Sequence, residues 1–263
     1  MIPLESPIAT GRTAEIYPWP DGLVLKLFYD WVSKGAVQTE ADVARAVYAA
    51  GLPVPAVGEL VQVRGRRGLL YERVDGATML DELSDRPWTL LQSARRLAAL
   101  HAIMHSLKPA AELPSQCERL AAKIRDVREL SPEQRNVLLD ALAKMPADNR
   151  LCHGDLHPAN VIVAQRGPVI IDWIDATLGN PLADVARTSV LVLGEAHNES
   201  HPWVWKRLIN WYHRVYLRTY FGLRPGGEAE YEAWRPIVAA ARMSEGIDEV
   251  QSWLLEQAAV LFW

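Results

Sequence analysis

A short polar segment in the middle of the chain carries the residues best suited to chemistry. His153, Asp155 and Asn160 occupy the spacing H-x-D-L-x-x-x-N. Asp172 directly follows an apolar stretch at 169–171. Transfer of a phosphoryl group to a hydroxyl needs a carboxylate that orients the hydroxyl and accepts its proton, together with oxygen ligands for a divalent metal. We therefore interpret Asp155 as a base, and Asn160 and Asp172 as ligands of Mg2+.

A lysine and a glutamate nearer the N-terminus would complete this chemistry. Lys26 lies inside the apolar segment 23–28, where an unpaired ammonium is costly to bury. Glu40 falls on the helix face that also carries Val37 and Ala44, so it points toward the strands rather than water. This pattern predicts an ion pair between Lys26 and Glu40 that holds the lysine against the α- and β-phosphates of a nucleotide.

Two regions of different character must position these residues. Residues 1–75 have the pattern of short strands around one helix, and residues 76–263 are mainly helical, with a hinge near 72–76. Strands are predicted near 16–17, 23–28, 57–63, 68–74, 161–163 and 169–171, and helices at 33–50, at 88–107, from Ser131 onward and over most of 181–263. This order predicts an α+β protein with a ligand site between two lobes.

The composition is that of an ordinary globular protein. Of 263 residues, 49% are hydrophobic and 23% are charged. The net charge of −4 provides no field that would attract a nucleic-acid backbone or an anionic membrane surface. Cys117 and Cys152 form no C-x-x-C pair, no stretch reaches 18 apolar residues, and the N-terminus lacks a signal-peptide pattern. We expect a cytoplasmic protein that binds neither nucleic acid nor membrane.

The motif region resembles a known family. The segment HGDLHPANVIV at 153–163, followed by VIIDWIDATLGNPLADVA at 169–186, is similar to the signature of the aminoglycoside phosphotransferase and choline kinase-like family. GRTAEIYPWPDGLVLKLF at 11–28 and TEADVARAVYAAGLPVP at 39–55 are similar to its lysine strand and glutamate helix. The resemblance implies a bilobal protein-kinase-like fold, with a small antiparallel-sheet N-lobe, a larger mainly helical C-lobe, and ATP between them.

The resemblance implies a role for each motif residue. Asp155 would be the base, Asn160 and Asp172 the Mg2+ ligands, Lys26 the phosphate lysine and Glu40 its partner. Glu72 and Val74 would offer backbone groups to the adenine ring, and Asp184 would brace the catalytic loop. The implied cofactors are ATP and Mg2+, and the implied acceptor is a hydroxyl of a small molecule.

The chain also departs from the protein-kinase pattern. It has no G-x-G-x-x-G loop; Gly11 remains, with Thr13 as a phosphate contact. Gly154 replaces the arginine of H-R-D, and no A-P-E motif follows the strand that ends at Asp172. These departures favour a small-molecule acceptor over a protein. Asp175 is either a second metal contact or a plain loop aspartate, and the sequence leaves both open.

Other functions are consistent with the same motifs. The missing glycines favour a kinase-like nucleotide-binding module with reduced catalysis, whereas the retained polar residues favour an enzyme. A protein kinase is a third alternative. Residues 191–263 hold nine acidic and seven basic side chains, which is too balanced to identify a cationic acceptor. The acceptor, the choice between ATP and GTP, any antibiotic resistance and the oligomeric state all stay open.

Several further patterns favour structural roles. His101 and His105 form an i, i+4 pair, but H-A-I-M-H lacks the glutamate of H-E-x-x-H and no third ligand is evident, so we interpret both as structural histidines. His153 is interpreted in the same way. We expect core packing for an aromatic stripe, with an acceptor pocket as the alternative; the stripe consists of Trp203, Trp211, Tyr212, Tyr216 and Tyr220. We expect solvated turn residues for a basic cluster, which consists of Arg64, Arg66 and Arg67.

Overall fold

The structure is a computed structural model of the protein, and it describes residues 4, 6–108, 113–198 and 200–262. The described residues form two compact units. The first contains those up to Met79 together with 159–174, and the second contains 80–108, 113–158 and 175–262. Because the chain changes unit after Pro158 and again at Asp175, the motif residues Asp155 and Asp172 belong to different units. The predicted functional lobes, 1–75 and 76–263, stay a prediction.

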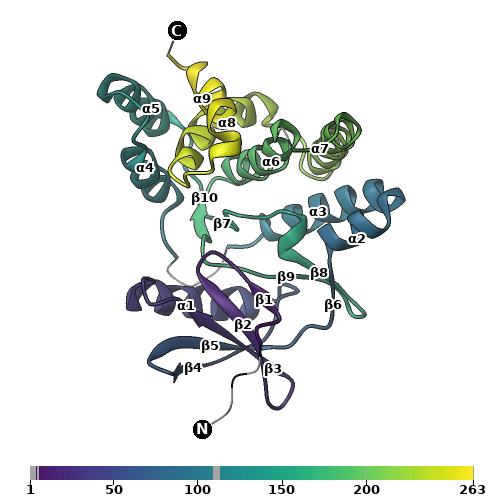
Figure 1. Cartoon of the computed structure of the whole chain (residues 1–263). Coiled ribbons are helices and arrows are strands. Elements are labelled where there is room, and N and C mark those ends of the chain that lie inside the picture. Colours follow the sequence, from purple (N-terminus) through teal and green to yellow (C-terminus); the bar gives the residue numbers. More distant parts are fainter. Residues whose placement is uncertain (1–3, 5, 109–112, 199, 263) are drawn as a thin grey trace. The chain divides into compact units, whose positions relative to one another are not determined.

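The first unit is built on a five-stranded antiparallel sheet with the strand order β1-β2-β3-β5-β4 (Figure 1). Its strands are β1 (Ala9–Thr10), β2 (Ala14–Trp19), β3 (Leu23–Phe28), β4 (Val57–Val63) and β5 (Arg66–Glu72). The turn between β2 and β3 has positive φ at Asp21 (59°) and Gly22 (73°). Aspartate and glycine tolerate this region, which allows the tight turn that follows Pro20.

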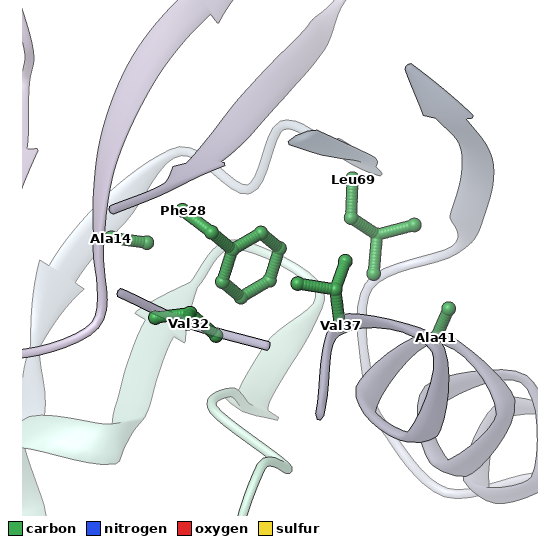
Figure 2. Close-up of a cluster of buried hydrophobic side chains, with 6 residues drawn as sticks. All are labelled: Ala14, Phe28, Val32, Val37, Ala41 and Leu69. Carbon is green, nitrogen blue, oxygen red and sulfur yellow. The ribbon is translucent and has the colours of Figure 1, made fainter. Parts of the chain in front are cut away.

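The central strand β3 is covered on both faces. Leu25 and Leu27 pack on one face, whereas Phe28 packs on the other face against helix α1 (Lys34–Ala49). The cluster on the α1 side, shown in Figure 2, consists of Ala14, Phe28, Val32, Val37, Ala41 and Leu69. Because successive side chains of a strand point to opposite faces, Lys26 shares the face of Phe28 and points toward α1.

A second, three-stranded antiparallel sheet of the first unit has the order β6-β8-β9. Its strands are β6 (Gly76–Thr78), β8 (Val161–Ala164) and β9 (Gly167–Ile170). Val161 is paired with Ile170, and the ladder continues because the N–H of Ile171 donates to the carbonyl of Asn160 at 3.0 Å. Asn160 and Asp172 therefore emerge at the same end of the β8–β9 hairpin.

The second unit is mainly helical and also contains a two-stranded ladder. The ladder pairs β7 (Arg150–Cys152) with β10 (Thr177–Gly179). Its helices are α2 (Met79–Asp85), α3 (Leu90–Met104), α4 (Gln116–Asp126), α5 (Pro132–Lys144), α6 (Pro181–His197), α7 (Trp203–Leu223), α8 (Glu228–Met243) and α9 (Asp248–Ala259). Helix α3 packs on α7, and α8 packs on α4, α6 and α9.

Helix α6 lies at the centre of the second unit. It contacts α7, α8 and α9, and most of its side chains are buried. Its start is determined locally: the Asn180 side chain accepts from the N–H of Leu182 at 2.8 Å, and Pro181 occupies the first position. Two charged residues, Asp184 and Arg187, are buried in this otherwise apolar helix. They lie three positions apart and so face the same side, where the segment after β7 passes.

Most predicted elements are confirmed. The fold class is α+β, and α1, β4, β8 and β9 match their predicted segments to within a residue or two. The Ser131 capping box is present: the Ser131 hydroxyl accepts from the N–H of Gln134 at 3.2 Å, and the Gln134 side chain accepts from the N–H of Ser131 at 2.9 Å. Helices α2 and α4 were not predicted. Within the described ranges no helix is both long enough and apolar enough to cross a bilayer.

Two side-chain expectations are wrong in part. Arg66 is not a solvated turn residue. Its guanidinium donates to the Glu15 carboxylate at 2.7 Å and to the carbonyls of Leu27 and Phe28, so it links β5 to β2 and β3. In the aromatic stripe the three tyrosines are buried, as expected, but Trp203 and Trp211 are 68% and 50% exposed and contribute little to the core.

Candidate active site

In the first unit, Lys26 joins two carboxylates. Its Nζ lies 2.6 Å from Oε1 of Glu40 and 2.9 Å from Oδ1 of Asp172. The lysine and Glu40 are almost fully buried, whereas 41% of the Asp172 side chain is exposed. The predicted Lys26–Glu40 ion pair is thus present in the structure, and Asp172 is its third member. Sheet register and helix periodicity bring together three residues that are up to 146 positions apart.

The charges of this cluster depend on one another. Burial lowers the pKa of Lys26, but the adjacent carboxylates of Glu40 and Asp172 outweigh burial and raise the pKa above its ordinary value. Lys26 is therefore a cation. Burial raises the pKa of Glu40, although Lys26 and the hydroxyl of Tyr71, which donates to Glu40 at 3.1 Å, oppose this change. Tyr71 was not predicted; it fixes the carboxylate from the sheet side.

Asp172 has an unusual backbone. Its φ is 64°, a left-handed conformation that few residues other than glycine adopt. The preceding hairpin holds this unfavourable backbone conformation in place, because Ile170 is paired in β9 and the N–H of Ile171 donates to the carbonyl of Asn160. This turn directs the Asp172 carboxylate toward Lys26. Non-glycine residues in this region concentrate at functional sites.

In the second unit, an arginine holds the predicted base. Oδ1 of Asp155 accepts from Nη2 of Arg187 at 3.0 Å, and Oδ2 lies 3.5 Å from Nε2 of His157. The same Nη2 lies 2.7 Å from the carboxylate of Glu245. Burial raises the pKa of Asp155, but hydrogen bonding to His157 and the charge of Arg187 outweigh burial, so the pKa lies below its ordinary value. Asp155 is therefore ionised and has a fixed orientation.

Asp184 is the hydrogen-bond acceptor beneath this loop. Its carboxylate accepts from the N–H of His153 at 2.7 Å and from the N–H of Gly154 at 2.8 Å. Gly154 has φ 77°, and a Cβ there would lie 2.4 Å from the carbonyl oxygen of Asp175. This close approach excludes the arginine that protein kinases carry at the same position of the motif. Asp184 thus contacts the backbone immediately before Asp155, as its predicted bracing role requires.

The histidine pair also binds Asp184. Nε2 of His101 and Nε2 of His105 lie 3.0 and 3.2 Å from the same oxygen, Oδ2. Their Nδ1 atoms contact the hydroxyls of Tyr216 (2.6 Å) and Tyr220 (2.8 Å). Each ring nitrogen therefore already has a partner, which fits a structural role. The sequence pattern did not reveal that Asp184 is a third potential ligand: the three groups lie within 4.8 Å of one another.

Four predicted nucleotide contacts lie elsewhere in the first unit. Gly11 and Thr13 belong to the loop between β1 and β2, where the N–H of Gly11 donates to the carbonyl of Ala14 at 2.9 Å. Glu72 ends β5, and Val74 follows it. The side chain of Glu72 accepts from the N–H of Ala56 and from Arg166, so its carboxylate has a structural role. The roles of these four residues toward a nucleotide stay predictions.

Three charged residues near the catalytic loop were not predicted. Arg187 had a usable signal, because an arginine in the apolar run that follows Asp184 must have a buried partner. No sequence signal pointed to Glu245 or Arg242. Both lie far from the motif in the sequence and meet it only because α8 packs on α6.

The sequence profile of the phosphotransferase enzyme family matches residues 12–225 of the chain. A search of curated proteins found no match. Three solved structures show the breadth of the structural similarity. A thermostable mutant of an aminoglycoside phosphotransferase, in a ternary complex with AMP-PNP and hygromycin B, has a TM-score of 0.66 at 15% identity, covering 98% of this chain and 92% of that one.

The other two structures differ in their named substrates. A choline/ethanolamine kinase family protein from Mesorhizobium loti has a TM-score of 0.65 at 18% identity, covering 98% of this chain and 86% of that one. An aminoglycoside-3'-phosphotransferase of type VIII has a TM-score of 0.61 at 22% identity, covering 90% and 93%. The shared feature is the kinase-like fold. The profile match spans most of the chain, so this protein belongs to the phosphotransferase enzyme family.

Proposed function

We propose that this protein is an ATP- and Mg2+-dependent O-phosphotransferase that acts on a hydroxyl of a small molecule. The observation that carries the proposal is the cluster in which Lys26 contacts both Glu40, at 2.6 Å, and Asp172, at 2.9 Å. A buried, charged lysine beside a half-exposed carboxylate suits the phosphates of a nucleotide and the cation that accompanies them. A purely structural ion pair would not need the exposed third member.

Residues 1–75 would bind the nucleotide. Lys26 would contact the α- and β-phosphates while Glu40 keeps it in place. Gly11 and Thr13 would approach the phosphates from the β1–β2 loop, and backbone groups near Glu72 and Val74 would meet the adenine ring. Similar structures crystallised with AMP-PNP or ADP support this assignment.

Asn160 and Asp172 would hold Mg2+. Carboxylate and amide oxygens are ligands that suit this ion, which is usually bound by one or two carboxylates together with phosphate oxygens. The fit is supported by the position of both residues at one end of the β8–β9 hairpin and by the exposure of Asp172. When bound, Mg2+ offsets the negative charge of the phosphates.

Residues 76–263 would supply the catalytic loop and the acceptor site. Asp155 would orient the acceptor hydroxyl and accept its proton as the new O–P bond forms and the bond between the γ-phosphorus and the ADP oxygen breaks. The lowered pKa of Asp155 makes it a weak base, so its main contribution is orientation. Arg187 would keep the carboxylate ionised and in place through the 3.0 Å contact.

Replacement of the base tests the reaction. We expect Asp155→Asn to lower turnover by about two to four orders of magnitude, while stabilisation by Mg-ATP in a thermal-shift titration is retained. Asp140→Asn, an exposed aspartate on α5, is the matched control and should behave like wild type. Undiminished phosphotransfer by Asp155→Asn would contradict the mechanism.

Replacement of the metal ligand tests the nucleotide site. We expect Asp172→Ala to lose the Mg2+-dependent part of ATP stabilisation, with exposed Asp30→Ala as its control. Equal stabilisation of Asp172→Ala and wild type would contradict the assignment. The alternative of a nucleotide-binding module with reduced catalysis predicts retained Mg-ATP stabilisation but no ADP release above background with any acceptor.

A further inference from the structure

A cavity in the second unit is lined by four cationic side chains: Arg119, Lys123, Arg187 and Arg242. Gly154 also lines it, and Arg187 contacts Asp155 at 3.0 Å, so the cavity lies directly beside the proposed base. An acceptor that presents its hydroxyl to Asp155 can therefore extend a neighbouring group toward this cavity.

The carboxylates around the cavity are already committed to other partners. Asp184 is fully buried and accepts from two backbone N–H groups and from the histidine pair. The Glu245 carboxylate is shared among Lys123 (3.4 Å), Arg187 (2.7 Å) and Arg242 (3.8 Å). A cationic ligand would therefore have to take a carboxylate away from an interior arginine or from the catalytic loop.

The two partly exposed ion pairs at the edge of the cavity are easier to rearrange. Asp175 lies 3.2 Å from Arg119 and 3.6 Å from Lys123, and all three side chains are about 30% exposed. Such partly exposed ion pairs contribute little and are readily exchanged. A carboxylate or phosphate on a ligand could replace Asp175 as the partner of Arg119 and Lys123.

Arg242 gives independent support for an anionic ligand. It is 95% buried, and its Nη1 donates to the carbonyl of Val190 at 2.7 Å. Its Nε forms no hydrogen bond with the described residues and lies 3.8 Å from the Glu245 carboxylate. Burial, with the nearby charge of Arg187, lowers the pKa of Arg242 to about 10. Because Glu245 is shared with Arg187 and Lys123 and is not within hydrogen-bond distance of Arg242, a closer anion would stabilise this buried guanidinium further.

We propose that the acceptor carries an anionic group, a carboxylate or a phosphate, close to the hydroxyl that is phosphorylated, and that Arg119, Lys123 and Arg242 recognise this group. The inference rests on the proposed function, because it places the hydroxyl at Asp155. Guanidinium groups bind carboxylates and phosphates through paired, charge-assisted hydrogen bonds. Polycationic amino sugars would meet carboxylates that already have cationic partners, and should be poor acceptors.

The test compares acceptors that share one skeleton. Gluconate, glucose 6-phosphate, glucose and glucosamine are supplied with Mg-ATP, and ADP release is measured together with the thermal shift that each compound adds in the presence of AMP-PNP. We expect an anionic member to exceed glucose by about tenfold or more in kcat/KM or in apparent affinity, the effect of one charge-assisted contact. The two anions distinguish a carboxylate site from a phosphate site.

Variants identify the groups responsible. Lys123→Met should remove most of the anionic preference, and exposed Lys144→Met is the control. Arg242→Met should do the same if it folds; the partly exposed Lys123 keeps the test decisive if it does not. No preference for an anion in either measurement, or a preference for glucosamine, overturns the inference. The proposed function fails separately, if Asp155→Asn retains full phosphotransfer.

Discussion

Replacing Asp184 by asparagine probes the link between the helical interior and the catalytic loop. The carboxylate is completely buried. Oδ2 accepts from the N–H of His153 and from Nε2 of His101 and of His105, whereas Oδ1 accepts from the N–H of Gly154. All of these partners donate hydrogen bonds to the carboxylate. An asparagine side chain has one acceptor oxygen and one donor NH2 group, so Asp184→Asn cannot accept from all of them in either orientation of its amide.

The cost follows from the better of the two orientations. With its carbonyl in the Oδ2 position, the amide keeps three acceptor contacts, but each loses its charge assistance, about 1 kcal/mol apiece. The NH2 group then faces the N–H of Gly154, and this donor–donor contact costs about 1–3 kcal/mol. Removing a buried charge returns part of this, so we expect a net destabilisation of about 3–5 kcal/mol. For a chain of this size the midpoint of thermal unfolding should fall by roughly 6–10 °C.

The assay is differential scanning fluorimetry with urea unfolding, carried out on wild type, Asp184→Asn and the exposed control Asp140→Asn. Phosphotransfer should fall together with stability, because His153 and Gly154 immediately precede Asp155. A midpoint within about 2 °C of wild type would refute the hydrogen-bond reasoning. Chelation also discriminates: a midpoint that drops to the same extent in wild type and Asp172→Ala when EDTA is added would indicate a metal at His101, His105 and Asp184.

Three further predictions concern other buried charges. Lys26→Met leaves the carboxylate of Glu40 buried without its cation and should cost about 3 kcal/mol in urea unfolding, whereas the double variant with Glu40→Leu should recover part of the loss. Burial lowers the pKa of His105 to about 3, so the residue is neutral when folded but protonated when unfolded below its ordinary pKa of 6.5. Its contribution to stability is complete above pH 6.5 and falls by about 1.4 kcal/mol per unit as pH drops from 6.5 toward 3; His105→Gln should show a flatter acid limb in urea unfolding measured at several pH values. Arg187→Met removes the cation that lowers the pKa of Asp155, so the acid limb of kcat should move to higher pH while KM for ATP stays unchanged, and Arg187→Lys should shift the limb less.

Local patterns were sufficient for the residues that lie on regular elements. The alternation of β3 places Lys26 on the face of Phe28, and the periodicity of α1 places Glu40 on its buried side. Their contact at 2.6 Å could therefore be predicted from two short segments. The hairpin formed by β8 and β9 likewise explains why Asn160 and Asp172 lie at one end, since both strands were recognisable as apolar runs.

Long-range packing determined what the sequence could not reveal. Arg187 and Glu245 lie 58 positions apart and meet only through the packing of α8 on α6. The sequence shows no third ligand beside His101 and His105, yet Asp184, which the resemblance assigns another role, lies beside both. Arg66 looked solvated because a turn was expected, whereas it begins β5 and bonds across the sheet. In each case the partner lies on an element whose position the pattern does not specify.

The two aspartates proposed for the chemistry are held in the same way in their separate units. Lys26 is bound by the buried Glu40 and reaches the more exposed Asp172. Arg187 is bound by the partly buried Glu245 and reaches the more exposed Asp155. In both, a glutamate neutralises and fixes the cation, which then orients an aspartate. The orientation exists before any ligand arrives, so the cost of ordering these carboxylates is not incurred during the reaction. It follows that Glu40 and Glu245 matter for turnover although neither is proposed to touch the transferred group.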